Sequence, residues 1–138
     1  MGMESEREVF MMPTKAGRFV YWAPRILAIL FVLFLAMFSL DVIEPGRSVG
    51  EIVVGMLMHN IPVFILIGLL IIAWKYELVG VITFGAAGLL YMTLTVSEAI
   101  RSEVPWYVGV TWGLTLGGPA LLVGILFLVS WSWQRKRR

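Results

Sequence analysis

The sequence predicts an all-α polytopic membrane protein, a four-helix transmembrane bundle with both termini in the cytoplasm. The chain is 59% hydrophobic and only 14% charged, which is far from the composition of an ordinary soluble domain. Its apolar residues gather in four long runs, and most of its Lys and Arg residues flank these runs on one side. Composition therefore predicts the class, the runs predict the spans, and the basic residues predict the orientation.

Each apolar run is long enough to cross a bilayer as a helix. A helix needs about 20 residues to span about 30 Å of hydrocarbon, and all four runs reach that length. Only the first run contains a charge, Arg25, close to its start. We expect this long side chain to reach back to the inner membrane surface. The expected spans are residues 19–40, 52–74, 78–97 and 107–133.

The short connections between the spans leave no room for a second domain. We expect a cytoplasmic polar head at residues 1–18, a single transmembrane domain at residues 19–134, and a basic cytoplasmic tail at residues 135–138. The turn at residues 75–77 is tight, so the second and third spans should be antiparallel neighbours.

The basic residues give the orientation. Of the eleven Lys and Arg residues, only Arg47 and Arg101 fall on the outer side. Lys and Arg in short flanking segments are retained in the cytoplasm, which places both termini inside, as an even number of spans requires. The basic residues form no groove-lining patch, so we expect the lipid bilayer as a partner and no nucleic acid.

His59 is the only histidine and lies inside an uncharged apolar run. An ionisable group at membrane depth is costly, so His59, Asn60 and Pro62 form a candidate intramembrane polar site. Pro62 has no N–H to donate to the carbonyl of Met58, which leaves that oxygen available. Asn60 points about a quarter-turn away from His59 and can bond to another helix. In the structural interpretation His59 is neutral and hydrogen-bonded across the bundle.

In a second interpretation His59 belongs to a proton or solute path, because imidazole titrates near neutral pH. Such a path needs carboxylates leading to the imidazole, and several lie at the outer end of the spans. We treat these as a candidate outer acidic cluster: Asp41, Glu44, Glu51 and Glu98.

Other chemistries find less support in the sequence. Met56, Met58 and His59 offer ligands suited to copper(I), but neighbouring helical residues point about 100° apart, so copper binding is the weaker alternative. Cysteine is absent, which removes thiol catalysis and iron–sulfur ligation. The chain has no nucleophile elbow, phosphate loop or HExxH motif. We therefore expect no enzyme activity, no cofactor and no resident metal.

Small residues predict a close helix contact. Gly109, Gly113 and Gly117 are spaced four apart on the fourth span, where they lie on one face and let another backbone approach. The third span carries Gly85 and Gly88, which could form the matching surface within the chain. The other possibility is that the seam faces a second copy.

Several short elements are shared with a known family. The first span contributes Arg25-Ile26-Leu27, Phe31–Phe38 and Asp41-Val42, and the second contributes His59-x-Ile61-Pro62 and Ala73-Trp74-Lys75-x-Glu77-x-x-Gly80. In these elements, over roughly residues 20–95, the chain resembles a family of small uncharacterised prokaryotic membrane proteins, a domain of unknown function. The resemblance implies four helices in a bacterial or archaeal plasma membrane and no known activity. It also draws attention to Glu77, which could pair with Lys75, Arg18 or Arg25.

Two classes of function follow. We expect a small structural or accessory membrane protein that acts through helix–helix assembly, as a homo-oligomer or as a subunit of a larger membrane complex. The alternative is a small proton- or cation-linked transporter or channel that uses His59.

Overall fold

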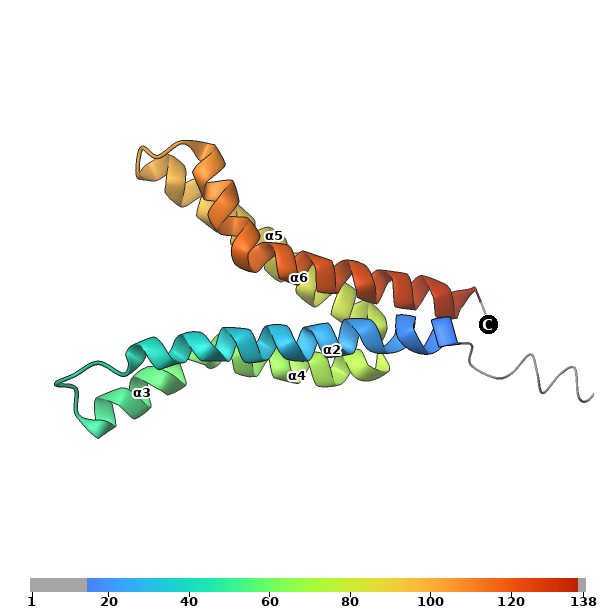
Figure 1. Ribbon diagram of the computed structural model, residues 1–138, viewed down its shortest axis with the longest axis horizontal. Coiled ribbons are helices and arrows are strands. Elements are labelled where there is room, and N and C mark those ends of the chain that lie inside the picture. Colours follow the sequence, from blue (N-terminus) through green and yellow to red (C-terminus); the bar gives the residue numbers. More distant parts are fainter. Residues whose placement is uncertain (1–14, 137–138) are drawn as a thin grey trace, which may run out of the picture.

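A computed structural model describes residues 15–136, and these are almost entirely helical (Figure 1). The remainder of the expected polar head and basic tail lies outside the described residues. No strand occurs in the described part of the chain, so the all-α prediction is confirmed. The helices are α2 (Lys15–Met37), the short 3-10 helix η1 (Phe38–Val42), α3 (Val49–His59), α4 (Ile61–Lys75), α5 (Glu77–Arg101) and α6 (Trp106–Arg135).

Three helical stretches are long and apolar enough to cross a membrane: Lys15–Val42, Glu77–Arg101 and Trp106–Arg135. Helices α3 and α4 provide a fourth if the pair is taken as one broken span, with a bend of 44° between them. These lengths and compositions are those of membrane-spanning helices.

The bend between α3 and α4 follows from the chemistry of Asn60 and Pro62. Pro62 lies in the first turn of α4, where its missing N–H is harmless, but it cannot continue the hydrogen bonding of α3. Asn60 instead caps α3, because its backbone N–H and its side-chain amide both donate to the carbonyl of Met56, at 3.0 and 2.9 Å. Among the described residues, the Asn60 amide therefore makes no hydrogen bond to a neighbouring helix. The amide is used within its own helix.

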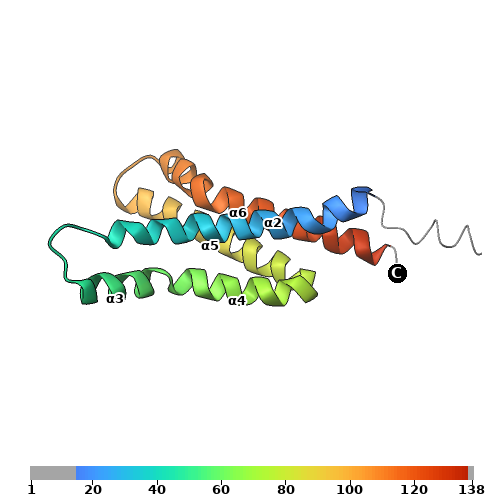
Figure 2. The same cartoon turned by 60° about the horizontal axis from the view of Figure 1, so that its bottom comes forward.

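The helices form two arms that meet at one end and separate toward the other in Figure 1, whereas α2 overlaps α5 and α6 in the view of Figure 2. One arm contains α2, α3 and α4, and the other contains α5 and α6. The start of α2 and the end of α6 lie at the joined end, whereas the connections after η1 and after α5 lie at the separated end. The helices thus pack together over only part of their length.

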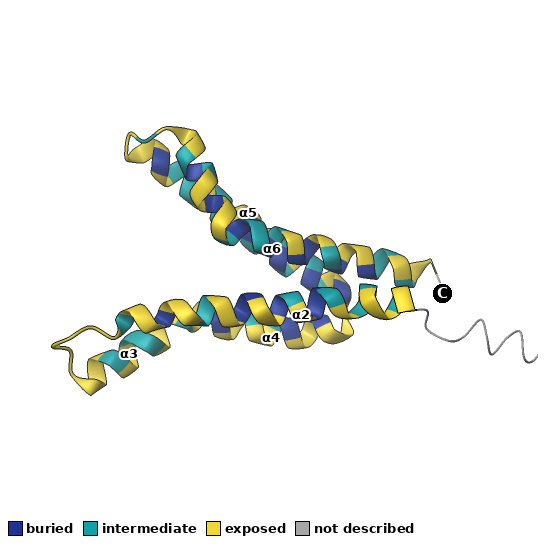
Figure 3. Ribbon diagram, in the orientation of Figure 1, coloured by how far each residue is buried: buried dark blue, intermediate teal, exposed yellow. Residues whose placement is uncertain are grey.

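The hydrophobic core lies where the arms meet (Figure 3). Phe31 of α2 packs edge-on against Phe84 of α5, with ring centroids 6.2 Å apart. Phe84 in turn stacks on Phe127 of α6, with centroids 6.0 Å apart. Such aromatic pairs contribute about 0.5–1.5 kcal/mol each beyond the area they bury. Many Leu, Ile and Phe side chains on the outward faces are exposed, as expected of helices that face hydrocarbon.

Helices α5 and α6 approach each other through their glycines. A Cβ added at Gly109 would lie 2.7 Å from the backbone oxygen of Thr95, and one added at Gly117 would lie 3.0 Å from the backbone oxygen of Gly88. No side chain fits at such positions without displacing the partner helix. The structure therefore places four of the expected glycines in the contact within the chain: Gly88, Gly109, Gly113 and Gly117. A Cβ added at Gly85 would meet nothing within 4 Å, so the close approach does not require a glycine there.

Candidate functional site

A buried ion pair joins the two arms at their common end. Arg25 of α2 donates from Nη2 to Oε1 of Glu77, the first residue of α5, at 3.1 Å. The two side chains have only 1% and 7% of their surface exposed. Ser130 and Gln134 of α6 donate to the same oxygen, each at 2.7 Å. One carboxylate oxygen therefore connects α2, α5 and α6.

Arg25 is held by further contacts on its own side. It donates to the carbonyl of Tyr21 and, at 3.2 Å, to the carbonyl of Trp74. Its guanidinium carbon lies 3.5 Å from the centroid of the Tyr21 ring, a favourable cation–π contact. The expectation that Arg25 reaches the membrane surface is therefore wrong. A carboxylate, two carbonyl oxygens and an aromatic ring compensate its burial inside the protein.

Ser130 and Gln134 belong to this cluster although the sequence analysis did not identify them. They are four residues apart on α6, so they lie on one helix face. Two polar residues at this spacing near the end of an apolar span indicate a polar helix face. Apolar periodicity alone does not reveal which carboxylate such a pair contacts.

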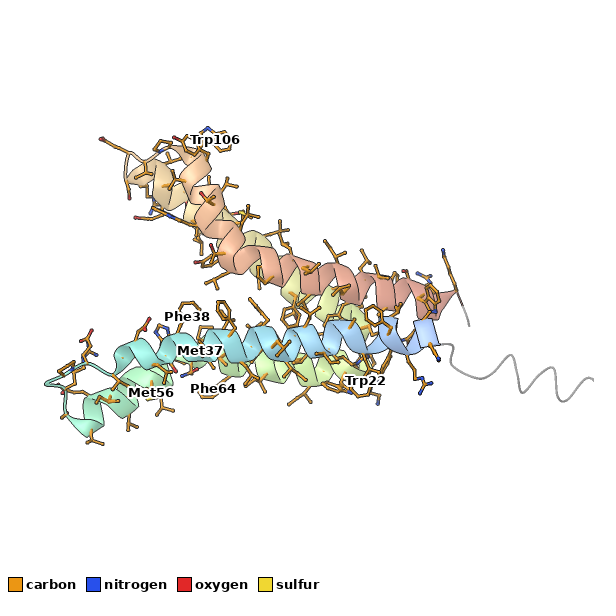
Figure 4. The ribbon with its side chains drawn as sticks, in the orientation of Figure 1. Trp22, Met37, Phe38, Met56, Phe64 and Trp106 are labelled. Carbon is orange, nitrogen blue, oxygen red and sulfur yellow. The ribbon has the colours of Figure 1, made fainter. Side chains whose placement is uncertain are left out.

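A cavity of about 550 Å³ lies between the arms. Its walls come from α2, η1, α3, α4, α5 and α6 and are mostly apolar, but Asp41 and His59 line it from one arm and Tyr91 from the other. Figure 4 shows Phe38, another wall residue, on the side of its arm that faces α5 and α6, whereas Trp106 lies at the tip of the other arm. The structure thus brings the candidate residues His59 and Asp41 to one cavity.

His59 is the last residue of α3, and its side chain is exposed. Among the described residues, neither His59 nor Asp41 has a hydrogen-bond or ion-pair partner for its side chain. The expected bond from His59 across the bundle is therefore not made within this part of the chain. Pro62 shares the cavity wall with His59, whereas Asn60 bonds to its own helix.

The four carboxylates of the expected outer cluster do not gather. Asp41 lines the cavity, and Glu44 forms an exposed ion pair with Arg47 at 2.9 Å. Glu51 lies at the start of α3, and Glu98 lies on α5, near the tip of the other arm (Figure 1). The described residues contain no group of three or more His, Asp or Glu side chains that could hold a metal ion. Asp41, Glu44 and Glu51 belong to one arm, and the separation of the arms keeps Glu98 apart from them.

Glu51 belongs to a capping box at the start of α3. Its backbone N–H donates to Oγ of Ser48 at 3.4 Å, and its carboxylate accepts from the Ser48 backbone N–H and hydroxyl, each at 2.8 Å. These two hydrogen bonds, the backbone one first, hold the pKa of Glu51 below its ordinary value of 4.5. Glu51 therefore stabilises the helix start.

The ligand set considered for copper(I) does not converge. His59 lines the cavity, but neither Met56 nor Met58 contributes to its walls. The Met58 side chain is exposed, in keeping with the angle between neighbouring helical residues. The geometry gives no support to a copper site made of these residues.

Comparison with known proteins identifies a family. No curated protein and no solved structure matches the chain. One family model matches residues 11–138, which include every residue that the structure describes. The expected membership in an uncharacterised family is thereby confirmed. The chain belongs to the family described as Domain of unknown function (DUF7670).

Proposed function

We propose that this chain is a non-catalytic accessory protein of a plasma membrane that acts by assembly, receiving a transmembrane helix of a partner protein in the cavity between its arms. The distribution of Lys and Arg supports cytoplasmic termini. The observation that carries the proposal is the cavity of about 550 Å³ whose apolar walls also present Asp41 and His59.

The two polar side chains favour a protein helix over lipid as the occupant. Asp41 and His59 lack partners among the described residues, and hydrocarbon chains supply none. A helix that brings a hydrogen-bond donor or a cation to this level satisfies both side chains, and such polar contacts stabilise helix association in membranes. An acyl chain would fill the apolar part of the cavity and leave both groups unpaired.

The glycine seam favours a different protein over a second copy. Gly109, Gly113 and Gly117 are the residues best suited to association with another copy. All three are buried in the contact with α5. Self-association through this face would require the α5–α6 contact to open, so the cavity is the better docking surface.

Photo-crosslinking tests the proposal. A photoreactive amino acid is introduced at Leu116, which lines the cavity, or at Leu114, which is exposed on the same helix away from it. In the membranes where the chain is naturally expressed, Leu116 should crosslink to one apolar segment of a partner that carries a donor or a cation, and Leu114 should not. Equal crosslinking from both positions, or crosslinks only to lipid or to a second copy, would contradict the proposal.

A matched pair of substitutions gives the control. Ala87→Trp fills the cavity from α5, whereas the neighbouring Ala86 is exposed and does not line it. We expect Ala87→Trp to abolish the crosslink from Leu116 and Ala86→Trp to leave it unchanged. The reverse result would place the partner on another face.

Proton- or cation-linked transport is the second candidate, and one observation favours it: Asp41 and His59 line the same cavity. The test is pH-driven flux into liposomes that contain wild type or His59→Ala. Flux that the substitution removes would support transport. Absence of flux with the wild-type protein would exclude it.

A further inference from the structure

A second cavity, of about 440 Å³, lies at the joined end of the arms. Its walls come from the turn between α4 and α5, at Lys75 and Tyr76, and from the last turns of α6, at Trp131 and Arg135. It shares no wall residue with the cavity that contains His59. The proposed assembly therefore makes no use of it.

Two cations line this second cavity without a carboxylate partner among the described residues. Nζ of Lys75 lies 5.6 Å from the centroid of the Tyr76 ring, and the guanidinium carbon of Arg135 lies 5.2 Å from that of Trp131. The ion pairs in the described part of the chain involve other residues. Both cations are exposed, so each is free to meet an anion in the cavity.

The one carboxylate on the wall, Glu77, does not cancel these charges. It is paired with Arg25 at 3.1 Å. Its Oε1 also accepts hydrogen bonds from Ser130 and Gln134. Because the buried guanidinium of Arg25 neutralises Glu77, Lys75 and Arg135 make the cavity electropositive.

The start of α5 adds to this character. Glu77 and Leu78 are its first two residues and lie on the cavity wall. The first N–H groups of a helix have no acceptor inside it and carry the positive end of its dipole. Anions bind readily beside such helix starts when cations are also present.

We propose that this second cavity binds a phosphate group, carried by an anionic lipid headgroup or by a free phosphate compound. The cavity lies at the end of the apolar helices, where the rings of Tyr76 and Trp131 are typical of headgroup level. Basic pockets between helices at this level recognise phosphate headgroups. Lys75 and Arg135 supply the charge, and the start of α5 supplies N–H donors.

Native mass spectrometry of the full chain in neutral detergent tests this site. The protein is titrated separately with short-chain phosphatidylglycerol, with diacylglycerol and with glycerol phosphate. We expect phosphatidylglycerol to bind in preference to the uncharged diacylglycerol. The variant Lys75→Gln/Arg135→Gln should bind it about 25-fold more weakly, since each cation near the surface contributes about a fivefold factor.

A control variant removes equal charge from the same end of the molecule. Lys15 and Arg18 are exposed at the start of α2 and do not line the cavity, so Lys15→Gln/Arg18→Gln should change the affinity less than twofold. The exchange Lys75→Arg/Arg135→Lys should retain binding. Glycerol phosphate is also added together with phosphatidylglycerol. If it displaces the lipid, the source of the phosphate group is a free compound; if it does not, the source is a lipid. The proposed site would be contradicted if both Gln variants lost the same affinity for phosphatidylglycerol, or if the wild-type protein did not prefer phosphatidylglycerol to diacylglycerol.

Discussion

Arg25 and Glu77 are separated by 52 residues, and their side chains meet at 3.1 Å in the buried joint between the two arms. The pair holds together two hairpins whose other ends diverge (Figure 1). A charge buried at such a joint is tolerated only with its partner, so the joint is sensitive to the loss of either side chain.

Removal of the carboxylate should therefore destabilise the protein strongly. We expect Glu77→Ala to lower the free energy of unfolding by about 3–5 kcal/mol, because it leaves the Arg25 guanidinium buried and unpaired. The measurement is an unfolding titration of the protein in mixed micelles. Glu44→Ala is the control, since the Glu44–Arg47 pair is exposed and should contribute less than about 1 kcal/mol. Equal effects of the two substitutions would contradict the role of the joint.

The α5–α6 contact predicts opposite outcomes for two glycine substitutions. A Cβ at Gly109 would lie 2.7 Å from the backbone oxygen of Thr95, whereas one at Gly68 would meet nothing within 4 Å. We expect Gly109→Ala to destabilise by about 1–3 kcal/mol through overpacking. Gly68→Ala should stabilise α4 by about 0.5–1 kcal/mol, because alanine loses less conformational entropy on folding. The same unfolding titration measures both changes in stability. If only Gly68→Ala lowered the free energy of unfolding, the α5–α6 contact at Gly109 would be contradicted.

His59 should contribute little to the stability of the isolated protein. Its side chain is exposed and lacks a partner among the described residues. We expect His59→Ala to change the free energy of unfolding by less than about 0.5 kcal/mol, while it weakens partner crosslinking from Leu116. A loss above about 1.5 kcal/mol would instead indicate a hydrogen bond that fixes helix register.

Glu51 should titrate at lower pH than an ordinary glutamate. The Ser48 backbone N–H and hydroxyl hold its pKa below 4.5. A lowered pKa in the folded state means that the stabilisation is present above the ordinary value and is lost as the pH falls through the lowered one. Carboxyl NMR shifts should show a midpoint below 4.5 that returns toward this value in Ser48→Ala. An unchanged midpoint in the variant would argue against the capping box.

Much of the fold could be predicted because long apolar runs constrain helices strongly. The third and fourth spans fall inside α5 and α6, and the second span breaks beside Pro62, a residue that cannot continue a helix. Backbone chemistry of this kind is local and readable in the sequence. The same holds for the glycine spacing on α6, although the identity of the facing helix required the structure.

The joint and the cavity depend on contacts between distant segments, which local patterns do not specify. Arg25 lies near the start of an apolar run, and nothing local distinguishes a side chain that reaches the surface from one that enters the joint. The sequence places Glu98 and Asp41 together because both lie at the outer ends of spans. The divergence of the arms keeps them apart.

The separation of the arms is the central feature of the fold, and distances between spin labels test it directly. The chain has no native cysteine, so label pairs are placed without background. Ile43→Cys/Ile100→Cys labels the two tips, and Phe19→Cys/Leu78→Cys labels the joined end; all four side chains are exposed. In lipid nanodiscs, double electron–electron resonance should give a clearly longer distance between the labels at the tips than between those at the joined end. A distance between the tips no longer than that at the joined end would mean a closed bundle without the cavity.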